Sequence, residues 1–246
     1  MATRDFADGG YRFIEGVSQY SAGVAALDGY EIARLRFETP VPLAEGFARI
    51  EARLAGAGRP LTAFCACELR SPEPFTEDGF RVFNTRYVET LERWGIVRDG
   101  VNPVARSNVC PEVGAAGEPV FHAFSYTRPT PELTRSFVVA GSGEVPEGQA
   151  NYRDHIVRRG DLGVEGLGEK VRFVLATMAA RMAELGFGWA DTTATQVYTV
   201  HDVHPFAAEI AGRAGGAGMT WHYARPPVVD IDYEMDCRRI PLEGVI

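Results

Sequence analysis

The sequence predicts an α+β protein made of two similar halves, each a mixed β-sheet with two helices on one face. Strand-like and helix-like segments follow one another in the same order twice along the 246 residues, and equivalent residues in the two runs lie at a nearly constant offset. Strands that bracket two helices favour a mixed sheet with both helices on one side. The 46% content of hydrophobic residues is enough for a buried core.

The clearest helix is predicted near residues 168–186, in the second half of the chain. Its apolar residues recur at spacings of three and four, which is typical of one buried stripe: Val171, Val174, Leu175, Met178, Met182 and Leu185. Gly186 is a natural C-terminal cap. A strand rich in β-branched and aromatic residues is predicted at 190–200. After the turn at 201–206, a second helix is predicted at 207–215.

The first half shows the same order of elements. It predicts a helix, a strand, a turn and a second helix at 42–58, 61–69, 71–75 and 79–95. Phe75 and Phe206, in the two turns, are 131 positions apart, and Gly58 and Gly186, at the two helix ends, are 128 apart. A near-constant offset indicates an internal duplication, although helix and strand also alternate in many unrelated α/β proteins.

Each half is also predicted to open with a hairpin and to close with strands. The hairpins are expected at 19–37, around a Leu-Asp-Gly turn, and at 136–148. The closing strands are expected at 104–110, 118–126 and 226–240. Because Pro129 and Pro131 interrupt regular structure, we place the boundary there, which gives halves at residues 1–128 and 129–246.

Composition excludes several classes of function. A formal charge of -8 argues against nucleic acid, which attracts basic surfaces. No run approaches the roughly 20 apolar residues of a membrane helix, and the charged start MATRDFADGG is unlike a secretion signal. We therefore expect no membrane association and a cytoplasmic location. Lys170 is the only lysine in the sequence, which argues against pyridoxal-phosphate chemistry.

The histidines provide a weak case for a metal site. His201 and His204, together with His222, are possible ligands. Pro205 follows directly, however, and the equivalent turn of the first half has no histidine, so a capped turn is the favoured interpretation. We expect no metal and no other cofactor.

Four short strings resemble motifs of one family. They are QYSAG at 19–23, FNTRY at 83–87, ARSNV at 105–109 and AGSGEVP at 140–146. The family counterparts are Pro-Tyr-x-x-Gly, F-x-x-N-x-x-Y, Pro-Ala-Arg-[Ser/Thr]-x-Val and Ser-Gly-Gln-x-Pro. On these strings the chain resembles a tandem member of the reactive-intermediate deaminase (RidA/YjgF) family.

The two halves depart from the family pattern in complementary ways. The first half has residues 33–36 (ARLR) in place of the Ser-Gly-Gln turn and lacks acids in its last strand, whereas the second half lacks the Asn-containing helix motif. One half supplies Tyr20, Asn84 and Arg106, and the other supplies the Ser-Gly turn and an acidic strand. Any functional pocket is therefore expected at a seam between the unlike halves.

The resemblance implies a cofactor-free deaminase that hydrolyses a small carboxylated enamine or imine to a keto or hydroxy acid and ammonia. Arg106 would hold a substrate carboxylate through two charge-assisted hydrogen bonds. Five further residues are predicted to bind substrate: Tyr20, Asn84, Ser142, Gly143 and Arg225. Two carboxylate-binding features in one pocket would suit 2-aminomuconate or a substituted relative, from the breakdown of aromatic amines or nitroaromatic compounds.

The reaction also needs a proton donor whose pKa is raised toward neutrality by burial. Glu234, Asp232 and Glu144 are the candidate catalytic residues. The alternation of acids with apolar residues over 230–237 also fits a half-buried strand with a solvated acidic face.

Two other functions stay open: a chorismatase-like hydrolase, and a metabolite-binding protein that has lost its chemistry. RidA domains resemble units that assemble in threes around a barrel-like core. Since two domains per chain cannot close such a ring alone, we expect a homotrimer.

Overall fold

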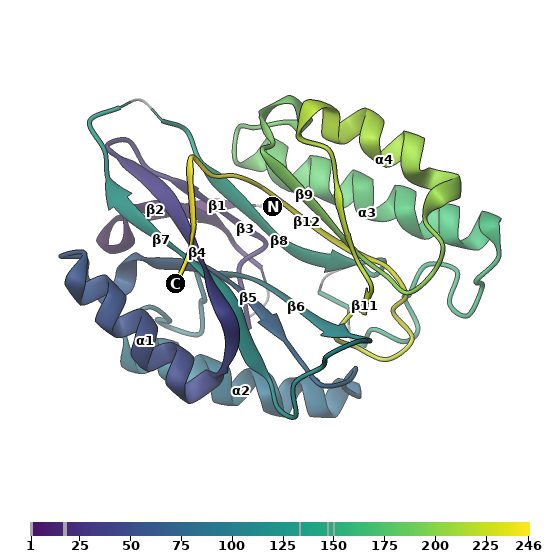
Figure 1. The fold of residues 1–246 in the computed structure, drawn as a ribbon, viewed down its shortest axis with the longest axis horizontal. Coiled ribbons are helices and arrows are strands. Elements are labelled where there is room, and N and C mark those ends of the chain that lie inside the picture. Colours follow the sequence, from purple (N-terminus) through teal and green to yellow (C-terminus); the bar gives the residue numbers. More distant parts are fainter. Residues whose placement is uncertain (1, 17–18, 133, 147, 150) are drawn as a thin grey trace.

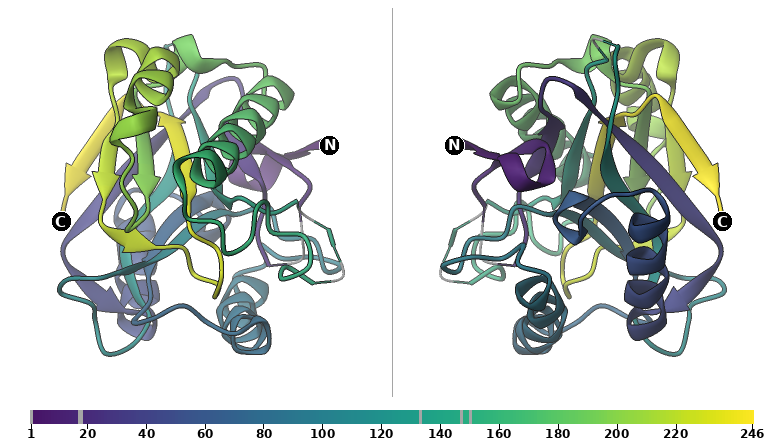
Figure 2. Two further views of the ribbon diagram at one scale, coloured as in Figure 1. Left: turned by 90° about the vertical axis from the view of Figure 1, so that its right-hand side faces the viewer. Right: turned by 90° about the vertical axis from the view of Figure 1, so that its left-hand side faces the viewer.

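The computed structural model describes residues 2–16, 19–132, 134–146, 148–149 and 151–246. Two β-sheets lie against each other, and a pair of helices covers the outer side of each sheet (Figure 1). Figure 2 shows the two helix pairs on opposite sides of the paired sheets. The predicted α+β class is confirmed, with two mixed sheets.

The first sheet is formed mainly by the first half of the chain. Its strand order is β11-β6-β5-β7-β4-β13. The strands are β4 (Tyr30–Pro42), β5 (Phe64–Arg70), β6 (Ala105–Pro111), β7 (Val120–Pro129), β11 (Ala224–Arg225) and β13 (Leu242–Val245). Helices α1 (Leu43–Gly56) and α2 (Glu77–Arg93) pack on this sheet.

The second sheet has the order β1-β2-β3-β8-β12-β9-β10. Its strands are β1 (Thr3–Phe6), β2 (Tyr11–Ile14), β3 (Gly23–Ala26), β8 (Phe137–Gly143), β9 (Ala194–Tyr198), β10 (Thr220–His222) and β12 (Glu234–Arg239). Helices α3 (Val164–Glu184) and α4 (Ala207–Ala214) cover it. Short 3-10 segments complete the described elements: η1 (Ala7–Gly9), η2 (Leu61–Ala63), η3 (Trp189–Asp191), η4 (His204–Phe206) and η5 (Gly215–Ala217). Among the described residues, no helix is both long and apolar enough to span a membrane.

The same four-strand arrangement occurs in both sheets. The order β6-β5-β7-β4 corresponds to β10-β9-β12-β8, with one parallel pair followed by two antiparallel pairs in each case. The two helix ends also match. Gly58 follows α1 with a φ of 64°, and Gly186 follows α3 with a φ of 80°, as expected for glycines that end helices in the left-handed region. The repeated order of elements is therefore present in the structure.

The two halves exchange strands at their ends. Strands β1–β3, from the start of the chain, extend the second sheet through antiparallel pairing of β3 with β8. Conversely, β13 pairs in parallel with β4 of the first sheet. The predicted boundary between residues 128 and 129 falls at the end of β7. Because each sheet takes strands from both sides of that boundary, the division into 1–128 and 129–246 stays a prediction.

Both predicted hairpins are wrong. The turn at 27–29 has the expected backbone, with φ of 80° at Gly29, but it leads from β3 in the second sheet to β4 in the first. Within 136–146 and at residue 148, the described part of the second range, strand β8 is followed by a loop and pairs with β3 and β12. Local turn chemistry predicts a change of direction, whereas strand pairing depends on residues far along the chain.

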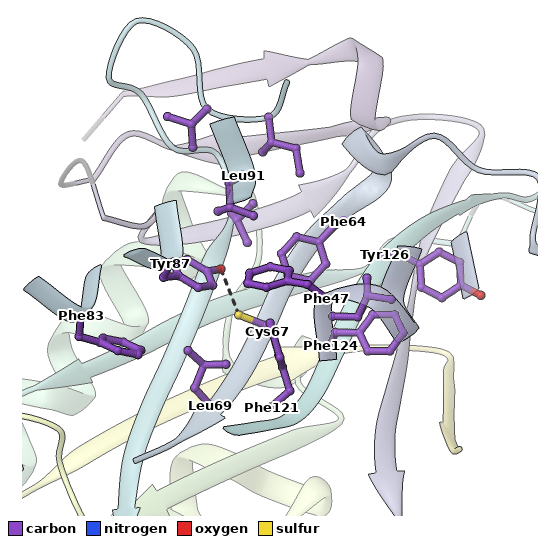
Figure 3. Close-up of a cluster of buried hydrophobic side chains, with 14 of the residues drawn as sticks. Phe47, Phe64, Cys67, Leu69, Phe83, Tyr87, Leu91, Phe121, Phe124 and Tyr126 are labelled. Carbon is purple, nitrogen blue, oxygen red and sulfur yellow. Dashed lines mark hydrogen bonds between the residues drawn. The ribbon is translucent and has the colours of Figure 1, made fainter. Parts of the chain in front are cut away.

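A cluster of buried aromatic and aliphatic side chains lies between the first sheet and its helices (Figure 3). In this cluster the Tyr87 hydroxyl lies 3.2 Å from the Cys67 thiol. The ring of Tyr87 also lies 4.9 Å from the guanidinium carbon of Arg106. The apolar core therefore extends to the residue that the sequence singles out as the substrate anchor.

The two sheets approach closely where β6 meets β8. A Cβ added to Gly141 would lie 3.2 Å from the Cα of Ser107, which is a tight contact between a backbone of each sheet. The Ser107 hydroxyl donates a 2.7 Å hydrogen bond to the Asp236 carboxylate on β12. Gln196 and Tyr198 also donate to that carboxylate, at 2.8 and 2.9 Å. Three donors satisfy this buried acid, and one of them comes from the opposite sheet.

Candidate active site

A cleft, partly open to solvent, lies where β6 meets β8 and the start of β12. Five of the residues predicted from the sequence line it: Tyr20, Arg106, Ser142, Gly143 and Glu234. Arg106 comes from the first half of the chain, whereas Glu234 comes from the second. Residues from both parts of the chain therefore line the cleft, as expected for a pocket between the two predicted halves.

Loops from both halves form the wall of the cleft. Phe75 and Val228 pair through backbone hydrogen bonds, in which Phe75 donates to Pro227 and accepts from Val229. On another side, Glu77 at the start of α2 accepts hydrogen bonds from the backbone N–H groups of Tyr152 and Arg153. Val228 and Tyr152 line the cleft, and these contacts fix the loops to which the two residues belong.

Arg106 is the basic residue of the cleft, and its side chain is held on several sides. Only 3% of the residue is exposed, and its Nη2 donates a 2.6 Å hydrogen bond to Oδ1 of Asn84. Its guanidinium carbon lies between 4.9 and 5.6 Å from the centroids of four aromatic rings, those of Tyr20, Phe80, Phe83 and Tyr87. Such rings stabilise a cation electrostatically.

The second terminal nitrogen of Arg106 is available for a ligand. Nη1 is buried and has no hydrogen-bond partner among the described residues. A buried charged donor without a partner is costly, so a ligand oxygen at this position would relieve that cost. Asn84 does not line the cleft but orients the guanidinium. The sequence predicts that Asn84 binds substrate, whereas in the structure its contact is with Arg106.

Glu234 contributes a buried carboxyl group to the same cleft. Only 4% of the residue is exposed, and among the described residues its carboxylate has no hydrogen bond or ion pair. Burial raises the pKa of Glu234 well above its ordinary value, and the neighbouring charge of Asp236 raises it further. Both effects favour the protonated form of this carboxyl, which is the form that a proton donor needs.

Gly141 leaves the space that the Glu234 carboxyl occupies. A Cβ on Gly141 would lie 2.1 Å from Oε1 of Glu234, so any other residue at this position would displace the carboxyl. This glycine is part of the Gly-Ser-Gly string that the sequence identified. Its neighbour Ser142 accepts a 3.2 Å hydrogen bond from Nη2 of the buried Arg181, which holds the hydroxyl in place.

Glu144, a predicted proton donor, is not among the residues that line the cleft. Its fully buried carboxylate pairs with Lys170 Nζ at 3.0 Å. It also accepts hydrogen bonds from the backbone N–H groups of Asp232 and Tyr233, at 2.7 and 2.9 Å. Glu144 thus holds the segment that leads into β12 and positions Glu234.

Asp232 and Arg225 also lie outside the cleft lining. Asp232 pairs with Lys170 Nζ at 3.0 Å and with Nε2 of His201 at 3.2 Å. Arg225 is exposed and pairs with Glu112. Both charges are therefore paired with other side chains of the protein, and the roles of Asp232 as an acid and of Arg225 in substrate binding stay predictions.

The histidines take structural roles in the described part of the chain, where no group of three potential metal ligands comes together. His204 contacts Asp202, and His222 contacts Gln196. Asn108, which lines the cleft, was missed from the sequence. It lies two residues after Arg106 on β6, and the period-two alternation of a strand could have identified it.

The chain is similar to known deaminases over its whole length. A family model described as 2-aminomuconate deaminase CnbZ matches residues 3–244. A 2-amino-5-chloromuconate deaminase from Comamonas testosteroni is 53% identical over 245 residues, which cover 98% of each chain. These two matches confirm the predicted resemblance to a deaminase of the 2-aminomuconate type.

Two solved structures are similar to the chain at low sequence identity. A chorismatase aligns with a TM-score of 0.53 and 12% identity, over 92% of this chain and 78% of its own. The YjgF gene product of E. coli aligns with 45% of this chain and 84% of its own, with a TM-score of 0.32 and 16% identity. The chorismatase similarity shows a common fold and nothing about the reaction.

The raised pKa of Glu234 predicts a pH-dependent change in stability. Above the ordinary carboxyl pKa, the unfolded state loses this proton while the folded state keeps it, so the free energy of unfolding falls as pH rises. The variant Glu234→Gln cannot ionise and avoids this loss. We expect its Tm to exceed that of the wild type at about pH 8 and the difference to shrink toward about pH 4.

Thermal unfolding of both proteins across this pH range measures the effect. Glu51→Gln, at an exposed position of α1, removes the same formal charge from the surface and serves as the control. A Tm difference between Glu234→Gln and wild type that stays constant with pH would contradict the raised pKa.

Proposed function

The chain belongs to the 2-aminomuconate deaminase CnbZ family, and on that premise we propose that it hydrolyses 2-aminomuconate or a substituted relative. It is an enzyme that acts on a C–N bond, and the proposed products are the keto or hydroxy acid and ammonia. One observation carries the proposal: the open Nη1 of Arg106 and the buried carboxyl of Glu234 face the same cleft.

Arg106 would bind a carboxylate of the substrate. Its Nη1 donates to a carboxylate oxygen in a charge-assisted hydrogen bond, while Asn84 keeps the guanidinium in a fixed plane. Because the site is largely shielded from water, the interaction is stronger than at a surface. This places the enamine carbons within the cleft rather than in solvent.

Glu234 would supply the proton. Transfer of the carboxyl proton to the enamine carbon converts the C–N bond to an iminium, which water attacks at the carbon that bears nitrogen. The resulting tetrahedral intermediate releases ammonia as its C–N bond breaks and its C–O bond becomes a carbonyl. One proton of the attacking water restores the Glu234 carboxyl and its second proton passes to the leaving nitrogen, so the reaction consumes one water and requires no cofactor.

The apolar wall of the cleft suits the carbon chain of such a substrate. Val145, Val228 and Ile231 line this wall. The relative from Comamonas testosteroni is named for a 5-chloro substrate, and an apolar wall accommodates a halogen better than a hydrated polar group. We therefore include 5-substituted aminomuconates, from the breakdown of substituted aromatic compounds, in the proposed substrate class. No specific observation favours a chorismatase-like reaction or a protein without chemistry.

The assembly is proposed to be a cytoplasmic homotrimer. Each chain supplies two related domains, and closed symmetric assembly of three chains provides two complete sets of three. Light scattering during gel filtration is expected to give three times the chain mass of 26.9 kDa. A mass equal to one chain would contradict the trimer.

Substitution of the proposed anchor should remove activity. Arg106→Met keeps the length of the side chain within its aromatic surroundings but removes the charged donors. A charge-assisted hydrogen bond contributes about 1.5–3 kcal/mol, so kcat/KM for ammonia release from freshly generated 2-aminomuconate should fall roughly ten- to a hundredfold. Arg225→Ala, which removes an arginine outside the cleft, should stay within about twofold of wild type. Full activity of a folded Arg106→Met protein would refute the anchor.

The two candidate acids can be separated by isosteric variants. Glu234→Gln removes the proton donor and should lower kcat by roughly 10²–10⁴, while the cleft still binds the unreactive diacid muconate. Asp232→Asn alters an acid outside the cleft and should change kcat by no more than a few-fold. Steady-state ammonia release and calorimetric titration measure these effects. An equal loss of kcat in the two variants would rule out a distinct role for Glu234.

A further inference from the structure

A second unpaired donor lies in the cleft beside Arg106. Asn108 is only 3% exposed and lines the cleft, and its Nδ2 is buried without a hydrogen-bond partner among the described residues. A buried amide N–H₂ group that lacks an acceptor loses the hydrogen bonds it makes to water. Its position at the cleft indicates that the missing acceptor belongs to a ligand.

The orientation of this amide is set by a neighbouring residue. Ser71, which is 1% exposed, donates a 3.0 Å hydrogen bond from its hydroxyl to Oδ1 of Asn108. The backbone N–H of Ser71 also donates to the carbonyl of Val109, so Ser71 is tied to the same strand. Since Oδ1 is the acceptor for Ser71, Nδ2 is the atom left for the ligand.

Arg106 and Asn108 are held toward different sides of the cleft. They lie two residues apart on β6, so their side chains leave the same face of the strand with Cα atoms about 6.6 Å apart. Asn84 of α2 holds the guanidinium, whereas Ser71, directly after β5, holds the amide. This separation is comparable to that between the two carboxyl groups of an extended six-carbon diacid.

We propose that Asn108 binds the second carboxylate of the substrate and thereby selects dicarboxylic over monocarboxylic enamines. The reaction assigned to such substrates rests on the proposed function, whereas the preference for a diacid is a property of binding. Arg225, one of the residues that the sequence predicts to bind substrate, is paired with Glu112 outside the cleft. Among the described residues that line the cleft, Arg106 is the only basic one.

A neutral amide is a suitable partner for the second carboxylate. The amide forms a charge-assisted hydrogen bond with the anion. A second buried cation at this position would be repelled by the charge of Arg106, and a neutral amide avoids that repulsion. Arg181, a buried arginine of α3, already donates to the Ala140 carbonyl and to Ser142.

Binding of two unreactive ligands tests the proposal without any turnover. Muconate is a six-carbon diene with two carboxylates, and sorbate is a six-carbon diene with one. Calorimetric titration should show tighter binding of muconate to the wild-type protein. In Asn108→Leu, which keeps the branched shape but removes the donor, the Kd of muconate should rise roughly ten- to a hundredfold, whereas that of sorbate should stay unchanged.

Two further variants make the test independent of one substitution. Ser71→Ala frees the Asn108 amide to rotate. It should reduce the preference for muconate over sorbate by a smaller factor than Asn108→Leu does, although Ser71 does not line the cleft. Cys110→Ala changes a buried side chain two residues further along β6 and should leave the preference unchanged. Thermal unfolding establishes that each variant is folded.

Two results would overturn the proposal: equal affinity of the wild type for the two ligands, or loss of both affinities to the same extent in Asn108→Leu. If Asn108→Leu does not fold, an unchanged preference in Ser71→Ala overturns it. A protein that prefers muconate through Asn108 but releases no ammonia from 2-aminomuconate would refute the proposed function alone. Active deamination with an unaltered preference in Asn108→Leu would refute this inference alone.

Discussion

The buried hydrogen bond from the Ser107 hydroxyl to the Asp236 carboxylate joins the two strands that carry the candidate site. Ser107 lies between Arg106 and Asn108 on β6, and Asp236 lies two residues after Glu234 on β12. A shift of one strand against the other would therefore move the anchors relative to the acid. The close approach of Gly141 to Ser107 reinforces this placement, because it permits the backbones of the two sheets to touch. The geometry of the cleft thus depends on how the two sheets meet.

The electrostatics of the cleft follow from this packing. A guanidinium can be buried here because aromatic rings surround it and Asn84 accepts one of its hydrogen bonds. Burial and the charge of Asp236 raise the pKa of the Glu234 carboxyl, which lines the same cleft. Lys170 and Glu144, which are also buried, form an ion pair and stabilise the segment before β12. A protein with an acidic surface can therefore present a positive, partly dry site to an anion.

Much of the fold could be predicted from local sequence patterns. The helical periodicity around residues 168–186 and the repeated order of elements correspond to α3 and to the matching strand orders of the two sheets. The strand exchange at the two chain ends could not be predicted in this way. Pairing of β3 with β8, or of β13 with β4, joins segments more than a hundred residues apart, and the alternation within a strand does not specify its neighbour.

The same division applies to the candidate site. The sequence by itself determined the residue types that suit the chemistry, the Arg106 strand and the Gly-Ser-Gly string, because these motifs are short and contiguous. Only the tertiary structure decided which of the candidate acids is buried in the cleft, that Arg225 lies outside it, and that Asn108 lies inside. The reason is physical: alternation along a strand shows which side chains share a face, whereas burial and charge compensation depend on what packs against that face.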